Sequence, residues 1–318
     1  MDRTKKMRII AFGIIVFFVL VAVAGVVSRR NGGDNLMNPT GRVAVIRISG
    51  PIVGGDSGNG FGLNQTTTAT SGELMRQFRK ARKDESVKAV LLRIDSPGGS
   101  AAATQEAATE LQRLKDTGKP VVVSMGDTAA SGAYWLAAYG DKIYANPSSI
   151  TGSIGVYMSY YDVQGLSEKV GVKEEKIKSG AHKDIFSPFR PMTDDERQLT
   201  QNMVNNMYDQ FVAVVVRERH MDEGKVRALA DGRVFTGVQA QQEGLVDSLG
   251  NYYDALAYAG TLIGADPDKV PTVTYDDTPS LQQFLRGNVS LAPFWQSLYQ
   301  TNSNIPLPLA VMKGVWQQ

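Results

Sequence analysis

The stretch that decides the fold runs from residue 87 to residue 99 and reads VKAVLLRIDSPGG. Residues 87–94 are almost continuously apolar, which is the pattern of a strand buried on both faces of a sheet. Residues 95–99 (DSPGG) then predict a turn, because proline and paired glycines favour turns over regular structure. A helix is expected over about residues 102–115, closed by Gly118. A buried strand that leads through a turn into a helix is typical of an α/β domain.

The same alternation of strand and helix continues in both directions along the chain. Short β-branched runs predict further strands at residues 43–48, 121–125 and 142–145. Helical patterns are expected after a capping Ser71, just after residue 131, and at residues 193–220, 224–230 and 251–263. In the long helix, Met203, Met207 and Phe211 are spaced as one apolar face. Together these patterns predict an α/β domain with a largely parallel sheet and flanking helices.

The composition excludes several kinds of chemistry. The 318 residues include 34 Lys+Arg and 32 Asp+Glu, and this net charge of +2 gives no general attraction to nucleic acid. There is no cysteine, so disulfides, a thiolate nucleophile and cysteine-bound zinc are excluded. The two histidines, His182 and His220, do not have the spacing of a metal motif. Catalysis would therefore depend on hydroxyls, lysines and carboxylates.

The N-terminal region predicts a membrane anchor. Residues 9–27 form an uncharged apolar run that is just long enough to cross a bilayer as a helix. More basic residues precede this run than follow it, which favours a cytoplasmic N-terminus and an extracytoplasmic remainder. The alternative is a cleaved signal peptide, because residues 22–24 (AVA) resemble a cleavage site. We expect a retained anchor within residues 1–30, followed by a linker at 31–41.

Two turns carry candidate catalytic groups. In residues 95–99, the paired glycines allow backbone N–H groups to point into a cleft, as an oxyanion hole requires. In residues 126–134 (GDTAASGAY), Ser131 lies at a helix start among small residues that leave room for a peptide. The alternatives are a plain tight turn for the first stretch and a simple N-cap serine for the second.

A serine nucleophile needs a base, and three side chains are candidates. His220 lies in the charged sequence RERH, which is typical of a solvated helix end. His182 is followed directly by Lys183 in residues 178–184 (KSGAHKD). A lysine can act as a base when burial lowers its pKa, although most lysines lie at the surface.

Four motifs, in order, carry a family resemblance: residues 95–99, 126–134, 146–155 (NPSSITGSIG) and 178–184. Residues 235–237 (FTG) and 244–247 (GLVD) add to it. With these motifs, residues 42–265 resemble the short form of bacterial signal peptide peptidase A, of peptidase family S49 with a ClpP/crotonase-like fold. The resemblance implies that Ser131 is the nucleophile and Lys183 the general base. It also implies that Gly98, with Gly132, forms the oxyanion hole and that Ser153 orients the lysine; His182 is interpreted as a neighbour.

The same resemblance implies a function and an assembly. The family degrades remnant signal peptides, so apolar peptides at the membrane are the expected substrates of a serine endopeptidase. No metal or cofactor is required, and a homo-octamer with a groove between neighbouring subunits is expected. Residues 266–318 would form a C-terminal extension. Its apolar part, residues 305–312 (IPLPLAVM), suggests the hypothesis of a tail that visits an active site.

Three other functions remain open at the level of sequence. A crotonase-like enzyme acting on acyl-CoA could share the fold, although an extracytoplasmic location argues against a cytosolic substrate. A membrane scaffold or stress protein could keep the fold without catalysis, although the presence of both Ser131 and Lys183 argues against it. A protease dedicated to one membrane protein cannot be separated from the preferred interpretation by sequence.

Overall fold

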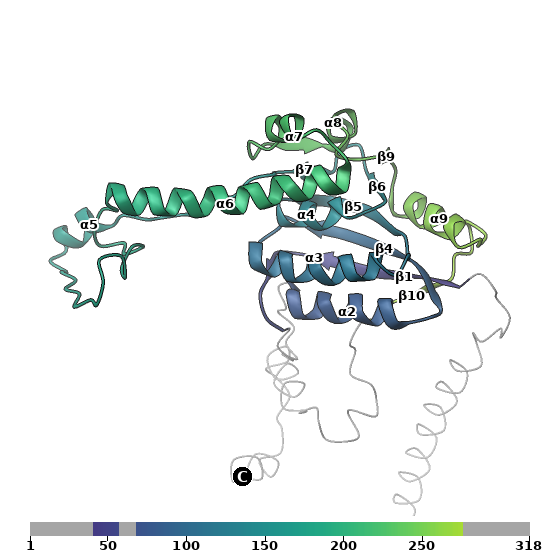
Figure 1. The fold of residues 1–318 in the computed structure, drawn as a ribbon, viewed down its shortest axis with the longest axis horizontal. Helices are drawn as coiled ribbons and strands as arrows, with labels where there is room; N and C mark the ends of the chain where they lie inside the picture. Colours follow the sequence, from purple (N-terminus) through teal and green to yellow (C-terminus); the bar gives the residue numbers. More distant parts are fainter. Residues whose placement is uncertain (1–40, 57–67, 276–318) are drawn as a thin grey trace, which may run out of the picture. The chain divides into compact units, whose positions relative to one another are not determined.

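A computed structural model describes residues 41–56 and 68–275 of the chain, and within them strands and helices alternate. The strands are β1 (Arg42–Ser49), β2 (Ile52–Val53), β3 (Ala69–Thr70), β4 (Val87–Ser96), β5 (Val121–Ala130), β6 (Lys142–Ala145), β7 (Ile150–Gly152), β8 (Val234–Thr236), β9 (Ser248–Leu249) and β10 (Thr272–Val273). The helices are α2 (Ser71–Lys83), α3 (Ala101–Lys115), α4 (Gly132–Ala138), α5 (Gln164–Lys169), α6 (Asp194–Arg219), α7 (Glu223–Leu229), α8 (Gly237–Glu243) and α9 (Tyr252–Leu262). Figure 1 shows the arrangement.

The main sheet is mostly parallel, as the sequence predicts. Its strand order is β10-β1-β4-β5-β6-β9, and each neighbouring pair in this path is parallel. The strand β7 pairs parallel with the far end of β5 and antiparallel with β8. A separate two-stranded sheet joins β2 and β3. This mixed α/β architecture fits the expected ClpP/crotonase-like fold.

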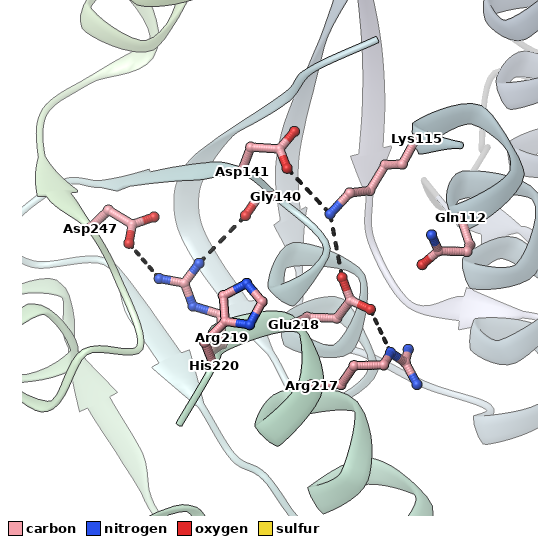
Figure 2. A pocket seen from close by; sticks show the side chains of 9 residues that line it. All are labelled: Gln112, Lys115, Gly140, Asp141, Arg217, Glu218, Arg219, His220 and Asp247. Carbon is pink, nitrogen blue, oxygen red and sulfur yellow. Dashed lines mark hydrogen bonds and ion pairs between the residues drawn. The ribbon is translucent and has the colours of Figure 1, made fainter. Parts of the chain in front are cut away.

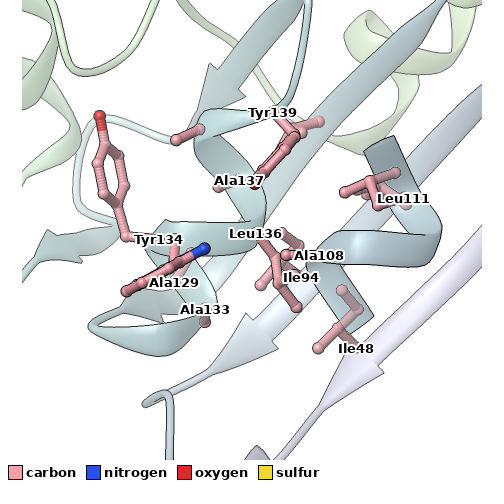
Figure 3. Close-up of a cluster of buried hydrophobic side chains, with 14 of the residues drawn as sticks. Ile48, Ile94, Ala108, Leu111, Ala129, Ala133, Tyr134, Leu136, Ala137 and Tyr139 are labelled. Atoms are coloured by element: carbon pink, nitrogen blue, oxygen red, sulfur yellow. The ribbon is translucent and has the colours of Figure 1, made fainter. Parts of the chain in front are cut away.

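Helices cover both faces of the sheet, which explains why its central strands are almost continuously apolar. Alternate residues of β4, such as Leu92 and Ile94, belong to a large core cluster with α2, α3 and α4. Figure 3 shows Leu111 of α3 and Leu136 of α4 in this cluster. The residue that precedes Leu92, Leu91, faces the opposite way and packs with α9. Most side chains of β4 are therefore buried, on one face of the sheet or the other.

Two local predictions are wrong. The residue that caps α2 is Thr70, whose Oγ1 accepts the N–H of Glu73, and Ser71 is the first helical residue. The strand predicted over residues 121–125 continues as β5 to Ala130, because its last residues pair with β7. The small, weakly apolar residues at the end of β5 do not carry the strand pattern, so the pairing partner decides their conformation.

Some predictions fall on residues outside the described ranges. The anchor at residues 9–27 and the apolar tail at residues 305–312 are among them. Among residues 41–56 and 68–275, no helix is both long and apolar enough to cross a membrane.

The helix α6 has two different halves. Its C-terminal half packs on the rest of the domain through Phe211 and three buried valines. Residues 197–210 include no buried side chain, and Met203 is 49% exposed. The predicted apolar face therefore contacts the core only near Phe211. At the other end of α6, away from the sheet, lie α5 and its flanking segments (Figure 1). We call residues 156–210 the arm.

Candidate active site

Ser131 lies where β5 ends and α4 begins, and its backbone is strained. Its φ of 54° and ψ of −126° are uncommon for a residue with a side chain. The Ser131 N–H donates to the Gly152 carbonyl at 2.8 Å, and its own carbonyl accepts the Trp135 N–H at 2.9 Å. Although Ser131 occupies the N-cap position, its side chain makes no capping hydrogen bond. The simple N-cap interpretation is therefore wrong. The hydroxyl of the half-buried Ser131 makes no hydrogen bond to the described residues.

The glycine turn after β4 packs directly on Ser131. Gly98 has a φ of +92°, and a Cβ at this position would lie 2.6 Å from the Gly132 nitrogen and 2.8 Å from the Ser131 Cβ. A side chain is therefore excluded by both conformation and space. The Gly98 N–H donates to Ser96 Oγ at 3.1 Å. Within the described part of the chain, the Gly132 N–H has no acceptor, as is usual in a first helical turn.

Ser153 lies beside Ser131 because two parallel strands end together. In β5 and β7, Ala130 pairs with Gly152, and each serine is the next residue along its strand. Ser153 also has a positive φ of 50°, and its N–H donates to the Arg233 carbonyl at 2.8 Å. The Thr151 hydroxyl donates to the Ala129 carbonyl at 2.7 Å and ties the two segments together. The structure thus brings together four predicted site residues: Ser131, Gly98, Gly132 and Ser153.

Lys183 is not part of this cluster within one chain. It is exposed and belongs to the segment between α5 and α6, and Figure 1 shows this segment at the end of α6 that is farther from the sheet. None of the hydrogen bonds and ion pairs among the described residues involves its side chain. The neighbouring His182 is 48% exposed, with its Nε2 3.5 Å from Asp195. Neither candidate base of the arm therefore reaches Ser131 in the single chain.

The helix behind Ser131 is fixed by large buried side chains. Tyr134 is fully buried, and its hydroxyl donates to the Leu245 carbonyl at 2.9 Å. This burial raises the pKa of Tyr134 well above its usual value. The Trp135 ring lies 4.9 Å, centroid to centroid, from Phe211 of α6. These contacts keep the first residue of α4, and with it the Ser131 turn, in place.

A polar hollow of about 720 Å³ at the C-terminal end of α6 was not found by sequence reasoning (Figure 2). The exposed His220 lines it, next to residues that pair with one another. Lys115 lies 3.3 Å from Glu218 and 3.4 Å from Asp141, and Arg219 forms an ion pair with Asp247. The only signal in the sequence is the charged run RERH at residues 217–220. The hollow contains none of the predicted site residues.

Comparisons with known proteins identify a family and relatives of this chain. The model of peptidase family S49 matches residues 113–266. "Putative protease slr0021" of Synechocystis is 43% identical over 211 residues, which cover 66% of this chain and 76% of that protein. Protease 4 of Haemophilus influenzae is 35% identical over 254 residues, covering 80% of this chain and 39% of the relative. "Serine protease SPPA, chloroplastic" of Arabidopsis thaliana is 34% identical over 209 residues, covering 65% and 31%.

The matched region contains the whole Ser131 turn, Ser153 and the Lys183 segment. The chain spans less than half the length of two of these relatives and about three quarters of the first. The identity to the first relative, over most of its length, is too high for a likeness of fold alone. The chain therefore belongs to peptidase family S49 and is of the signal peptide peptidase A type.

Proposed function

We propose that the chain is a serine endopeptidase in which Ser131 attacks the scissile carbonyl of a peptide. The observation that carries this proposal is the Ser131 hydroxyl, which is held on a strained turn and used by no capping bond. Backbone strain of this kind persists where the surrounding structure fixes it, and it is often found at catalytic residues. Membership of a peptidase family supports the same reaction class.

The turn also offers donors for the negative charge that develops on the carbonyl oxygen. The Gly132 N–H, one residue after the nucleophile, is free among the described groups. The Gly98 backbone packs against it and supplies the second side of an oxyanion hole. The Gly98 N–H would exchange Ser96 Oγ for the oxyanion when substrate binds. Fixed donors of this type contribute on the order of 10²-fold to 10³-fold each to the rate.

The base is assigned to Lys183 of a neighbouring copy of the chain. A lysine accepts a proton only when it is desolvated, and Lys183 is exposed in the single chain. The arm that carries it has many exposed apolar side chains, which is typical of an interface. They include Tyr157, Tyr161, Leu166, Val170, Val172, Ile177, Phe186 and Met203. In an assembly, the arm of one copy would bring Lys183 to the next copy's Ser131, where Ser153 would orient it.

Lys183 transfers protons in both halves of the reaction, as covalent bonds form and break. Lys183 takes the proton of Ser131 as the serine oxygen bonds to the carbonyl carbon, and it gives a proton to the leaving amine. In the second half, water bonds to the acyl carbon and gives its proton to Lys183, and the lysine returns a proton to Ser131 Oγ as the ester C–O bond breaks. Neither half of this reaction requires a metal or a cofactor.

Further features of the function rest on the sequence and on the family resemblance. We propose remnant signal peptides and other apolar peptides as substrates, a homo-octamer as the assembly, and no role for nucleic acid. Residues 9–27 would anchor the chain in the cell membrane, with the catalytic domain outside the cytoplasm. A protease bound to the membrane would meet such peptides where they remain after secretion.

Complementation between two inactive variants tests the proposal. Full-length Ser131→Ala and Lys183→Ala should each lose nearly all cleavage of an apolar fluorogenic peptide. When the two are unfolded, mixed equally and reassembled, about a quarter of the sites should regain a serine and a lysine from different copies. A serine-reactive fluorophosphonate should label Ser131 only in the mixture and in wild type.

Each alternative has its own result in this experiment. If the mixture stays inactive while each variant assembles normally, the base is not delivered between copies. If Lys183→Ala keeps its activity and His182→Ala loses it, the histidine is the base. A wild type that cuts no apolar peptide and is not labelled would favour the scaffold function.

A further inference from the structure

The turn that carries Lys183 is not held in place by buried apolar side chains of its own. Residues 181–186 form successive turns in the exposed part of the arm, and none of them is buried. A proton transfer needs its two heavy atoms within hydrogen-bond reach, so a base on such a turn must be fixed by other contacts. The contacts available here are charged ones, and they converge on the residue next to the base, Asp184.

Arg190 binds the Asp184 carboxylate in a bidentate contact. Its Nε lies 3.0 Å from Asp184 Oδ2, and its Nη2 lies 2.9 Å from Oδ1. The same Nη2 also donates to the Asp184 carbonyl at 3.2 Å, so side chain and backbone are both held. Lys178 approaches Oδ1 from the other side at 2.6 Å. The Asp184 side chain is only 10% exposed as a result, although the turn around it is open to solvent.

The same guanidinium also binds a carboxylate at the start of α6. Arg190 Nη1 lies 2.8 Å from Glu196 Oε2, and Nη2 lies 2.6 Å from Oε1. Glu196 is itself fixed, because it forms a capping box with Thr193 in which each residue accepts the other's backbone N–H. The Glu196 side chain is 3% exposed. The arginine thus connects an exposed turn to a capped helix of 26 residues.

We propose that Arg190 is the positioning residue of the catalytic base: it clamps the turn of Lys183, through Asp184, onto the first turn of α6. This inference rests on the proposed function, in which Lys183 is the base. Arginine suits the role because its planar fork bonds two carboxylates at once, whereas a lysine ammonium offers no such geometry. The rigid α6 then sets where the neighbouring copy receives the lysine.

Kinetics of two variants test the proposal in the full-length assembled protein. Arg190→Ala should lower kcat on the order of 10²-fold with little change in KM, because a base misplaced by about 1 Å costs that much. Arg190→Lys should keep part of kcat, since one carboxylate can still be bound. Millimolar guanidinium should raise the kcat of Arg190→Ala only. The rate of fluorophosphonate labelling of Ser131 should follow kcat across pH.

Arg227 offers a matched control. It also bridges two carboxylates, with Nη1 2.9 Å from Asp209 and Nη2 2.8 Å from Glu223, but it lies on α7, away from the turn of Lys183. Arg227→Ala should keep the wild-type kcat and show no response to guanidinium. An equal loss in Arg227→Ala and Arg190→Ala would overturn the proposal, because it would show a general effect of removing a surface arginine.

The remaining outcomes are also decisive. Wild-type kcat in Arg190→Ala overturns the inference and leaves the function intact, provided that Lys183→Ala is inactive. Dissociation of the assembly in both Arg190 variants overturns it too, since the arginine would then act on the interface. If Lys183→Ala is fully active, Lys183 is not the base and that part of the proposed function is wrong. Any effect of Arg190 then has a cause other than the positioning of Lys183.

Discussion

The turn of Ser131 and the turn of Lys183 are held in opposite ways. Ser131 is fixed by backbone pairing of β5 with β7, by the packed Gly98 and by the buried α4 behind it. Lys183 lies on an exposed arm. There the turn is held by the ion pairs of Arg190 with Asp184 and Glu196, and not by a packed apolar core. The proposed nucleophile is therefore preorganised within one chain, whereas the proposed base lies on an exposed extension of that chain. We infer that folding completes the first half of the site and assembly completes the second.

A charge on the apolar surface of the arm should have the largest effect. Tyr161→Asp should prevent the arm from docking, so activity should fall on the order of 10³-fold, which is within the range that a positioned general base contributes. The single-chain fold should keep its thermal unfolding temperature, because the Tyr161 side chain is 75% exposed. Mass measurement of the assembly and peptide cleavage check both expectations.

Tyr253 provides the control for this variant. It is 74% exposed and lies on α9, on the body of the domain. Tyr253→Asp should leave both the assembly and the activity unchanged. If Tyr161→Asp assembles and cuts like wild type, the arm is not the interface and the contrast between the two turns loses its meaning.

Adding one methyl group beside Ser131 should have the next largest effect. In Gly98→Ala, the new Cβ would lie 2.6 Å from the Gly132 nitrogen, so the oxyanion donors must move and kcat should fall on the order of 10²-fold. Gly118→Ala is the matched control, because its φ of +80° is similar but no atom lies within 4 Å. That control should lose about 1–2 kcal/mol of unfolding free energy and no activity. Equal kcat for the two variants would contradict the proposed role of Gly98.

Truncation of one leucine on each region should separate their contributions to stability. Leu111 of α3 is fully buried, so Leu111→Ala should lower the free energy of unfolding by about 2–5 kcal/mol. Leu199 of α6 lies on the arm and is 40% exposed, so Leu199→Ala should change the unfolding of the single chain by less than about 0.5 kcal/mol. Denaturant unfolding at low protein concentration measures both. Similar losses would mean that the arm has a core of its own.

The sequence predicted the body of the domain better than the arm, for a physical reason. The buried strand at residues 87–94 is specified by a local pattern and lies where it was expected, although β4 continues to Ser96, so that the turn predicted at residues 95–99 begins only at Pro97. The extension of β5 to Ala130 was missed because its conformation depends on a distant partner, β7. The motif around Ser131 located the turn of the proposed nucleophile, but only the structure shows that the Ser131 hydroxyl does not cap α4.

The position of Lys183 could not be predicted from spacing along the chain. Nothing in residues 178–184 indicates that the turn stands away from the sheet, because that depends on how far α6 extends beyond the core. Likewise, Arg190 and Glu196 look like ordinary surface charges in the sequence, and only their contacts reveal a clamp. The spacing of Met203 and Phe211 predicted one apolar face of the long helix, but only the Phe211 end of that face is buried.

Acid should loosen the arm before it loosens the body, and this is the smallest effect we expect. Arg190 lowers the pKa of the Glu196 carboxyl to about 2 and holds the pKa of Asp184 below its usual range. Because these folded-state pKa values are lowered, the ion pairs stabilise the arm fully above the ordinary values near 4. That stabilisation is lost as the pH falls toward about 2, when the carboxylates take up protons.

Hydrogen exchange measured by mass spectrometry checks this expectation. Between pH of about 5 and about 2.5, after correction for the intrinsic rate, exchange should rise in residues 178–196. Residues 103–114 of α3 should stay protected, although Arg79 also lowers the pKa of Glu110 there, because their protection comes from a packed core. Glu196→Gln should show fast exchange in the arm already at neutral pH. If α3 loosened first instead, the ion pairs would not be what holds the Lys183 turn, and the contrast between a packed nucleophile and a charge-clamped base would fail.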